Sequence, residues 1–202
     1  MRRRSRRSKK LIPLFAFLGV VVIAAISISV AWFINNDNLD GSGDNPNAQI
    51  SMPDAVTFNV SQSGEIISDS DCSFNLSGTN IDVLVRAYIT IEYTNSNLNS
   101  VVGAVVPNVT NNWVCSASGT TAEKINSGSW FYLNHKVAAA DVNNAITLFS
   151  SVSVTNDGDL YAQIEGQTVA INVYVETIQA NATGYNNWAD GGSLPIPTTI
   201  YQ

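Results

Sequence analysis

A period of two in the residue pattern runs through the middle of the chain, from Asp82 to Thr94. In an extended chain, successive side chains point to opposite faces. One face would collect Val83, Val85, Ala87, Ile89, Ile91 and Tyr93. The other face would carry Leu84, Arg86, Tyr88, Thr90, Glu92 and Thr94. The pattern therefore predicts a long strand with one buried face, because a helix would show a period near 3.6 residues.

A second alternation spans Gln167–Ala180, and together these two long strands predict the spine of a sheet. Shorter apolar runs predict further strands at 55–60, 65–68, 73–76, 101–106, 113–117, 129–133, 145–154 and 160–165. Turn residues separate these runs, and helix-forming residues are sparse. About ten short strands predict an all-β sandwich or barrel.

Three local predictions complete this assignment. Asn156–Asp159 has Asp-Gly at its centre, which is typical of a hairpin turn. A short helix is expected near Thr121–Ile125, and the tail after Ala180 is expected to be a loop.

The N-terminus consists of a basic tip followed by an apolar run. Seven of the ten Lys and Arg residues lie within residues 1–10, and the uncharged run Leu11–Phe33 follows. Its 23 residues would span roughly 30 Å as a helix, enough to cross a membrane. Ala31 ends a small-residue motif that would allow signal cleavage before Trp32. The sequence is compatible with two alternatives: the run is cleaved as a signal, or it stays as a membrane anchor through residues 11–33.

These features divide the chain into residues 1–33 as signal or anchor, 34–53 as a polar linker, and 54–202 as one domain. Beyond Phe33, 16 acidic residues face three basic ones, a formal charge of −13. Such a domain is unsuited to nucleic acid, which requires clustered Lys and Arg. We expect the domain to be secreted, or held at the extracellular face of the plasma membrane.

Cys72 and Cys115 both lie in the part expected to be exported, where a disulfide is chemically allowed. The bridge would close a loop of about 40 residues and contribute about 3–4 kcal/mol. The alternative is two separate buried thiols.

The residues that carry enzyme or metal chemistry are few. His135 is the one histidine, no Gly-x-Ser-x-Gly motif is present, and a zinc site usually needs several His or Cys ligands. Asp69-x-Asp71 and Asp157-x-Asp159 are expected in turns, as surface acids or, alternatively, weak calcium ligands. We expect no enzyme activity, no catalytic, cofactor-binding or metal residues, and no cofactor.

Aromatic residues leave two interpretations open. They could form a face on which carbohydrate stacks, or they could cover the core of the domain. The residues are Trp113, Trp130, Phe131, Tyr132, Tyr174 and Trp188.

Several short segments resemble one family of exported proteins. Ala31-Trp32-Phe33, followed by an Asn/Asp-rich stretch, is similar to the signal end of proteins processed by the SipW-type signal peptidase of Gram-positive bacteria. Phe74–Asn80 with Val83–Ala87, Trp130–Tyr132 with Leu148-Phe149, and the closing Val173–Ala180 resemble segments of the TasA and camelysin group.

The resemblance implies a jelly-roll-like antiparallel sandwich at the cell surface or in a biofilm matrix. It also implies self-association into fibres, in which each subunit lends an N-terminal strand to the next. The lent segment would be about Trp32–Val60, with Ala55–Val60 as its apolar part. The alternative function is a membrane-anchored extracellular binding module for carbohydrate or another surface ligand.

Overall fold

A computed structural model describes residues 48, 50, 52–189 and 193–201. The expected signal or anchor at 1–33, its cleavage between Ala31 and Trp32, and most of the linker at 34–53 lie outside the described residues. Within the described ranges, no helix has both the length and the apolar character needed to cross a membrane.

The first sheet, sheet A, is antiparallel and has five strands. In spatial order these are β1 (Val56–Asn59), β9 (Thr168–Gln179), β4 (Val83–Tyr93), β7 (Phe131–Leu133) and β6 (Trp113–Val114). The central pair β4 and β9 is in register over eleven residue pairs, from Val83↔Gln179 to Tyr93↔Val169. The prediction of two long strands that form the spine of a sheet is therefore confirmed.

The second sheet, sheet B, is built around β8. Its strands are β2 (Ile66–Ile67), β3 (Cys72–Phe74), β5 (Val105–Val109) and β8 (Ile146–Val154), all antiparallel to β8. Val152 pairs with both β2 and β5, and Phe149 pairs with both β3 and β5. Since a residue has one neighbour on each side, β2 and β3 lie end to end along one edge of β8, and β5 lies along the other.

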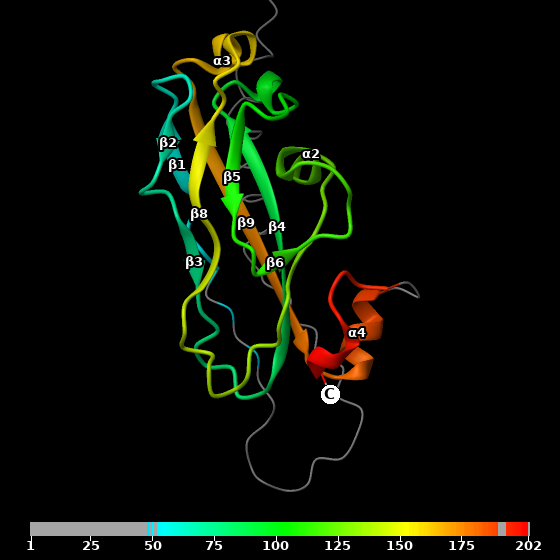
Figure 1. Cartoon of the computed structure of the whole chain (residues 1–202). Coiled ribbons are helices and arrows are strands. Elements are labelled where there is room, and N and C mark those ends of the chain that lie inside the picture. The colour runs from blue at the N-terminus through cyan, green and yellow to red at the C-terminus, as the bar shows by residue number, and fades with distance from the viewer. Residues whose placement is uncertain (1–47, 49, 51, 190–192, 202) are drawn as a thin grey trace, which may run out of the picture. The chain divides into compact units, whose positions relative to one another are not determined.

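The two sheets share one apolar core. Val85, Ala87 and Ile89 of β4 are at most 1% exposed, and they belong to the same buried cluster as Phe149 and Val152 of β8. Figure 1 shows β8, β5 and β3 as a layer in front of β9 and β4. The prediction of a mostly β protein with antiparallel sheets is confirmed.

Pro107 lies inside β5, although the sequence pattern placed it between two strands. It pairs with Val152, and the register shifts between Pro107 and Val109. A proline lacks the N–H that a regular ladder needs, so it is tolerated at such an irregular position. The strand expected at 101–106 therefore lies at Val105–Val109.

The hairpin predicted at Asn156–Asp159 and the strand predicted at 160–165 are both wrong. Residues Gly158–Ile164 form helix α3. The Asp157 carboxylate accepts hydrogen bonds from the backbone N–H groups of Asp159 (3.0 Å) and Leu160 (3.1 Å). Asp-Gly here begins a helix with an N-cap, because the side chain satisfies two otherwise free donors.

The helix expected near Thr121–Ile125 is present as α2 (Thr121–Asn126). Thr120 and Glu123 form a capping box, in which each side chain accepts a hydrogen bond from the other residue's backbone N–H. After β4, the chain forms the 3-10 helix η1 (Ser96–Leu98).

The tail after Ala180 is not a simple loop. It contains helix α4 (Ala182–Ala189) and the 3-10 helix η2 (Thr198–Tyr201). Gly184 allows α4 to approach the end of β9, since a Cβ atom there would collide with the carbonyl oxygen of Gln179. Tyr185, Leu194 and Ile196 are buried with Leu84 and Tyr132 in a second apolar cluster on the outer face of sheet A.

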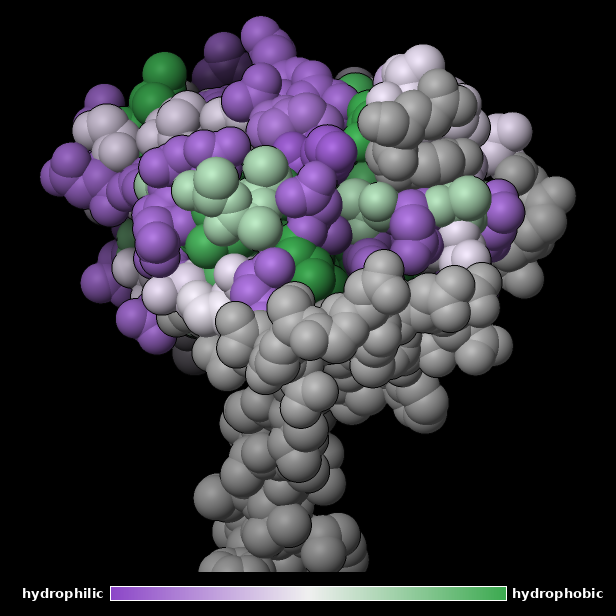
Figure 2. Space-filling view, turned by 90° about the horizontal axis from the view of Figure 1, so that it is seen from below, coloured by the Kyte–Doolittle hydropathy of each residue, from purple (hydrophilic) through white to green (hydrophobic). Residues whose placement is uncertain are grey.

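The described residues leave few large apolar side chains exposed. Among the described residues, Ile66 is the one large hydrophobic side chain classed as exposed, at 66%. Seen from below the view of Figure 1, the described surface is mainly hydrophilic, with smaller apolar areas between polar ones (Figure 2).

Candidate functional site

The edge strand β1 lies within the segment predicted to be lent to a neighbour. It pairs with β9 over four residues, from Val56↔Ile171 to Asn59↔Thr168. The pairing continues where the Val60 N–H donates to the Gln167 carbonyl at 2.9 Å, and Thr168 Oγ1 donates to Asn59 Oδ1 at 2.7 Å. β1 is thus an edge strand of its own domain.

Residues before β1 also contact the core. Ala48 is 8% exposed within the main cluster, and Ile50 and Met52 pack against that cluster. Val56 and Phe58 continue the same contact, each half-buried. The end of the expected linker therefore covers apolar core surface, together with the strand that follows it.

The outer face of sheet A carries an ion pair between two long strands. Arg86 of β4 and Glu176 of β9 are register partners, and Arg86 Nη2 lies 2.6 Å from Glu176 Oε2. Arg86 Nε also donates to the same oxygen, at 2.8 Å. The Arg86 side chain is 18% exposed, and that of Glu176 is 45% exposed.

Two tryptophan rings cover the Arg86 guanidinium. Its carbon lies 4.2 Å from the ring centroid of Trp130 and 4.7 Å from that of Trp188. A cation near the face of an indole ring is attracted by the negative charge density of that face. Trp188 belongs to α4, so this contact joins the C-terminal helix to the sheet.

Further rings extend this arrangement into an aromatic cluster, which comprises Tyr88, Trp130, Tyr132, Tyr174 and Trp188. Tyr88 lies 5.6 Å from Trp130 and 6.2 Å from Tyr174, centroid to centroid. Tyr132 lies 6.1 Å from Trp188, nearly edge-on.

The six aromatic residues singled out in the sequence thus divide between two environments. The outer face brings together Trp130, Tyr132, Tyr174 and Trp188. Trp113 and Phe131 belong to the main core, where Trp113 packs 6.3 Å from Phe74. Tyr88, Arg86 and Glu176 complete the outer arrangement. The alternation of β4 placed Arg86 and Tyr88 on one face of their strand, but the pairing register that joins them to β9 is a long-range property.

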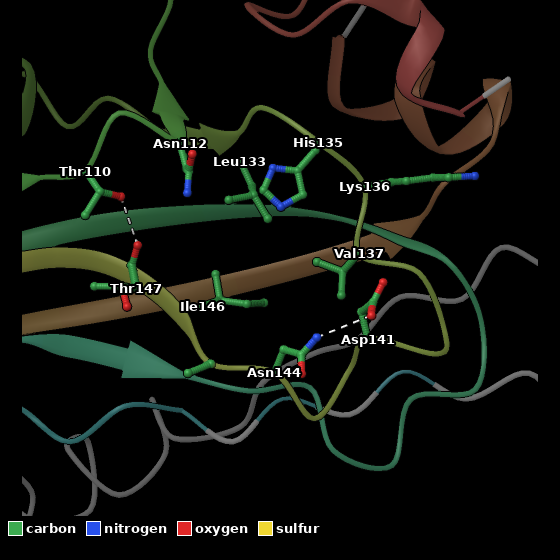
Figure 3. A pocket seen from close by; sticks show the side chains of 11 residues that line it. Thr110, Asn112, Leu133, His135, Lys136, Val137, Asp141, Asn144, Ile146 and Thr147 are labelled. Carbon is green, nitrogen blue, oxygen red and sulfur yellow. Dashed lines mark hydrogen bonds between the residues drawn. The ribbon is translucent and has the colours of Figure 1, made fainter.

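A cavity of about 460 Å³ lies between the β5–β6 connection, the end of β7 and the start of β8. Such a volume falls within the range of small-molecule sites, about 300–1,000 Å³. Its lining residues come from three segments: Thr110, Asn112, Leu133, His135, Lys136, Val137, Asp141, Asn144, Ala145, Ile146 and Thr147. In Figure 3, Lys136 extends away from the other labelled side chains.

The polar groups of this cavity are largely engaged with one another or with nearby residues. Thr110 Oγ1 donates to the Thr147 carbonyl at 3.1 Å, and Asn144 Nδ2 donates to Asp141 Oδ1 at 3.3 Å. The Lys136 ammonium lies 2.9 Å from Asp82 Oδ2. His135 is exposed, and its Nδ1 lies 2.8 Å from Asn134 Oδ1.

The contact between Lys136 and Asp82 lowers the pKa of the Asp82 carboxyl. The hydrogen bond from Lys136 and a second from the Ala139 backbone N–H hold the pKa of Asp82 below its ordinary value. Asp82 therefore stays ionised to lower pH than a free aspartate does.

Cys72 and Cys115 are both free thiols in the structure. Cys72 is buried on β3 of sheet B, and Cys115 is half-buried just after β6 of sheet A. Burial raises the pKa of the Cys72 thiol to about 12, and the neighbouring Asp71 carboxylate adds to the rise. Cys72 is therefore a protonated, unreactive thiol at neutral pH.

The aspartate pairs serve local structure. Asp157 caps α3, and Asp71 accepts a hydrogen bond from Ser73 Oγ at 3.1 Å. Among the described residues, no three His, Cys, Asp or Glu side chains gather as a metal site would require.

Comparisons with known proteins give no relative from which to transfer a function: no family model, no curated protein and no solved structure matches the chain.

Proposed function

We propose that this chain is an exported structural protein of the cell surface or extracellular matrix, and that it forms fibres by lending its N-terminal strand to a neighbouring copy. The observation that carries the proposal is β1, a short edge strand that pairs with β9 and follows a polar linker. An edge strand that pairs through only four residues can be replaced by the same strand of another copy, because the main-chain hydrogen bonds are identical.

The burial pattern supports this exchange. Ala48, Ile50, Met52, Val56 and Phe58 all contact the main core from the N-terminal segment. If this segment left, it would uncover both apolar core surface and the backbone edge of β9. An uncovered edge favours the addition of another strand, so the open form would be captured by a neighbour.

The topology supports a jelly roll as the underlying fold. Along the chain, strands alternate between sheet A and sheet B, except that β2 and β3 both lie in sheet B and that β6 and β7 form a hairpin within sheet A. The first strand lies beside the last in one sheet, and β2 with β3 lies beside the next-to-last in the other. Such wrapping is typical of a jelly roll, in which a long hairpin is folded over itself.

A reversible covalent lock of β1 tests the proposal. Thr57 and Ala170 are register partners on β1 and β9, and both can be replaced by cysteine in a Cys115→Ser background. Their Cβ atoms are expected about 4.5–5.5 Å apart, so a disulfide needs only a small backbone adjustment. The oxidised protein cannot release β1, and the reduced protein can.

We expect fibres in electron micrographs of the reduced variant that begins at Trp32, and monomers in the oxidised one. The Thr57→Cys single variant serves as the control, since it has the same residue on β1 and no partner on β9. Fibres that form equally well from the oxidised protein would show that β1 is not exchanged. A reduced protein that stays monomeric at high concentration would also overturn the proposal.

Export is supported by the basic tip and apolar run before a domain of formal charge −13. The N-terminal sequence of protein released by cells should begin at Trp32. Recovery of all the protein in the membrane fraction, with residues 1–33 intact, would contradict the fibre proposal and favour an anchored domain.

A further inference from the structure

The aromatic cluster on the outer face of sheet A has a chemistry that β1 and the strand exchange do not use. None of its five rings belongs to the main core cluster. Trp130, Trp188 and Tyr132 pack with the C-terminal segment, whereas Tyr88 and Tyr174 belong to neither apolar cluster. Tyr88 and Tyr174 are half-buried side chains on adjacent strands, in direct register.

Hydrogen-bonding groups lie between and beside these rings. On the same face of the sheet, the pair Arg86 and Glu176 lies two positions along the strands from Tyr88 and Tyr174. The pair Thr90 and Asn172 lies two positions away in the opposite direction. The face thus alternates an ion pair, two phenol rings, and a hydroxyl with an amide. The Thr90 hydroxyl is buried and has no hydrogen-bond partner in the part of the chain that the structure describes.

This combination matches the two kinds of surface that a pyranose ring presents. The C–H groups on the face of a sugar carry partial positive charge and pack against the negative face of an aromatic ring. Its hydroxyl groups both donate and accept, and they need partners such as an amide, a carboxylate or a phenol at the rim of the ring. A mainly apolar protein partner would leave these polar groups unpaired, at a cost in free energy.

The charge of the face selects among polymers. Arg86 is already bonded to Glu176, so this pair contributes no net charge. The rest of the chain after Phe33 has only Lys124 and Lys136 against its remaining acids, and Lys136 is paired with Asp82. An anionic polymer would be repelled by the net negative charge of the part of the chain after Phe33, whereas an uncharged polymer would not.

We propose that the outer face of sheet A binds an uncharged polysaccharide chain, with sugar rings against Tyr88, Tyr174 and the exposed part of Trp130. The Arg86–Glu176 pair and Asn172 bond the hydroxyl groups at the rim. An extended chain fits this position because the rings lie along a sheet face. The proposal goes beyond fibre formation, and it holds whether the chain is anchored or released.

Binding to a panel of polymers tests the proposal, with the domain that begins at Trp32. The panel consists of cellulose, chitin, β-1,3-glucan and mannan as uncharged polymers, and alginate as an anionic one. We expect retention on at least one uncharged polymer and none on alginate. The double variant Tyr88→Leu/Tyr174→Leu should weaken that retention at least about tenfold, because both rings are lost.

Tyr88→Phe is the matched control, since it keeps the ring and removes only the hydroxyl. It should retain most of the affinity, and Tyr161→Leu on helix α3 should retain all of it. Unfolding by denaturant, followed for each variant, separates lost binding from lost fold. Because β1 is untouched, fibre formation should be unchanged in every one of these variants.

Three results would overturn the proposal. One is no retention on any uncharged polymer, and another is retention that the double variant leaves unchanged. The third is self-association through this face, seen as an oligomer that the oxidised Thr57→Cys/Ala170→Cys protein still forms and the tyrosine variants abolish. That last result would identify a second copy of the chain as the occupant.

Discussion

The two faces of β4 are packed by different parts of the chain and by different chemistry. On the inner face, Val85, Ala87 and Ile89 are almost fully buried against residues of both sheets. On the outer face, Leu84 packs with the C-terminal tail, and Arg86 lies between an acidic partner and two tryptophan rings. The inner face needs only apolar volume at every second residue, whereas the outer face needs particular partners in particular places.

This difference has a consequence for stability. The inner core is continuous between the sheets, so a cavity there should weaken the whole domain. The outer cluster joins α4 and the tail to one face of one sheet, so a defect there should loosen that segment first. Local opening of a small unit can occur without global unfolding.

The largest expected effect belongs to the inner face. Phe149 is fully buried on β8, and Phe149→Ala should lower the free energy of unfolding by about 3–5 kcal/mol. Urea unfolding, followed by circular dichroism, should show the entire transition shifted to lower urea. Ile66→Ala, at an exposed residue of the same sheet, should change stability by less than about 0.5 kcal/mol. Similar losses in the two variants would contradict the assignment of the core.

An intermediate effect is expected at the outer face. Trp188→Ala removes the ring that contacts Arg86 and Tyr132, and should cost about 1–3 kcal/mol because Trp188 is only partly buried. Limited proteolysis should cut within the C-terminal tail while the sheets remain folded. If Trp188→Ala instead shifts the whole unfolding transition as far as Phe149→Ala does, then the two faces are not energetically distinct.

The smallest expected effect concerns the ion pair between Asp82 and Lys136, whose side chains are 40% and 37% exposed. The pKa of Asp82 is lowered in the folded protein, so the pair stabilises above the unfolded pKa, and that contribution is lost as pH falls through the folded pKa. Asp82→Asn should therefore cost less than about 1 kcal/mol at pH 7, and the difference from the parent protein should be smaller at an acidic pH below the ordinary aspartate pKa of 3.8. Urea unfolding at the two pH values measures this.

The corresponding control is Asp54→Asn, which makes the same substitution at an exposed carboxylate. A difference between the Asp82 variant and the parent protein that is equally large at both pH values would show that geometry, rather than charge, accounts for it.

The inner face could be predicted from sequence because it depends on a period of two that is visible within one segment. Val83–Tyr93 and Thr168–Gln179 were each predicted to within a residue or so at either end. The capping pair Thr120 and Glu123 likewise lies within four residues, and α2 was found where it was expected.

The outer face could not be predicted in the same way. Arg86 and Glu176 are far apart in sequence, and only the register of β4 with β9 makes them partners. The tail has no clear periodicity, and α4 is held by contacts with Leu84 and Tyr132 that exist only once the sheet has formed. The error at Asp157–Gly158 has a local cause, because the same dipeptide suits both a hairpin and a helix N-terminus, and the side-chain hydrogen bonds decide between them.

The pairing of β4 with β9 also limits when the domain can fold. Val83 and Gln179 are partners, so the central ladder joins segments separated by almost half of the chain. Contacts of such large sequence separation form slowly, since a long loop must close before any of them is gained. A chain that emerges from its N-terminus first must hold β1 and β4 without their shared neighbour β9 until β9 itself appears. During that interval the exposed edges would be open to premature association, which makes the delay itself a hazard for a protein that carries an exchangeable strand.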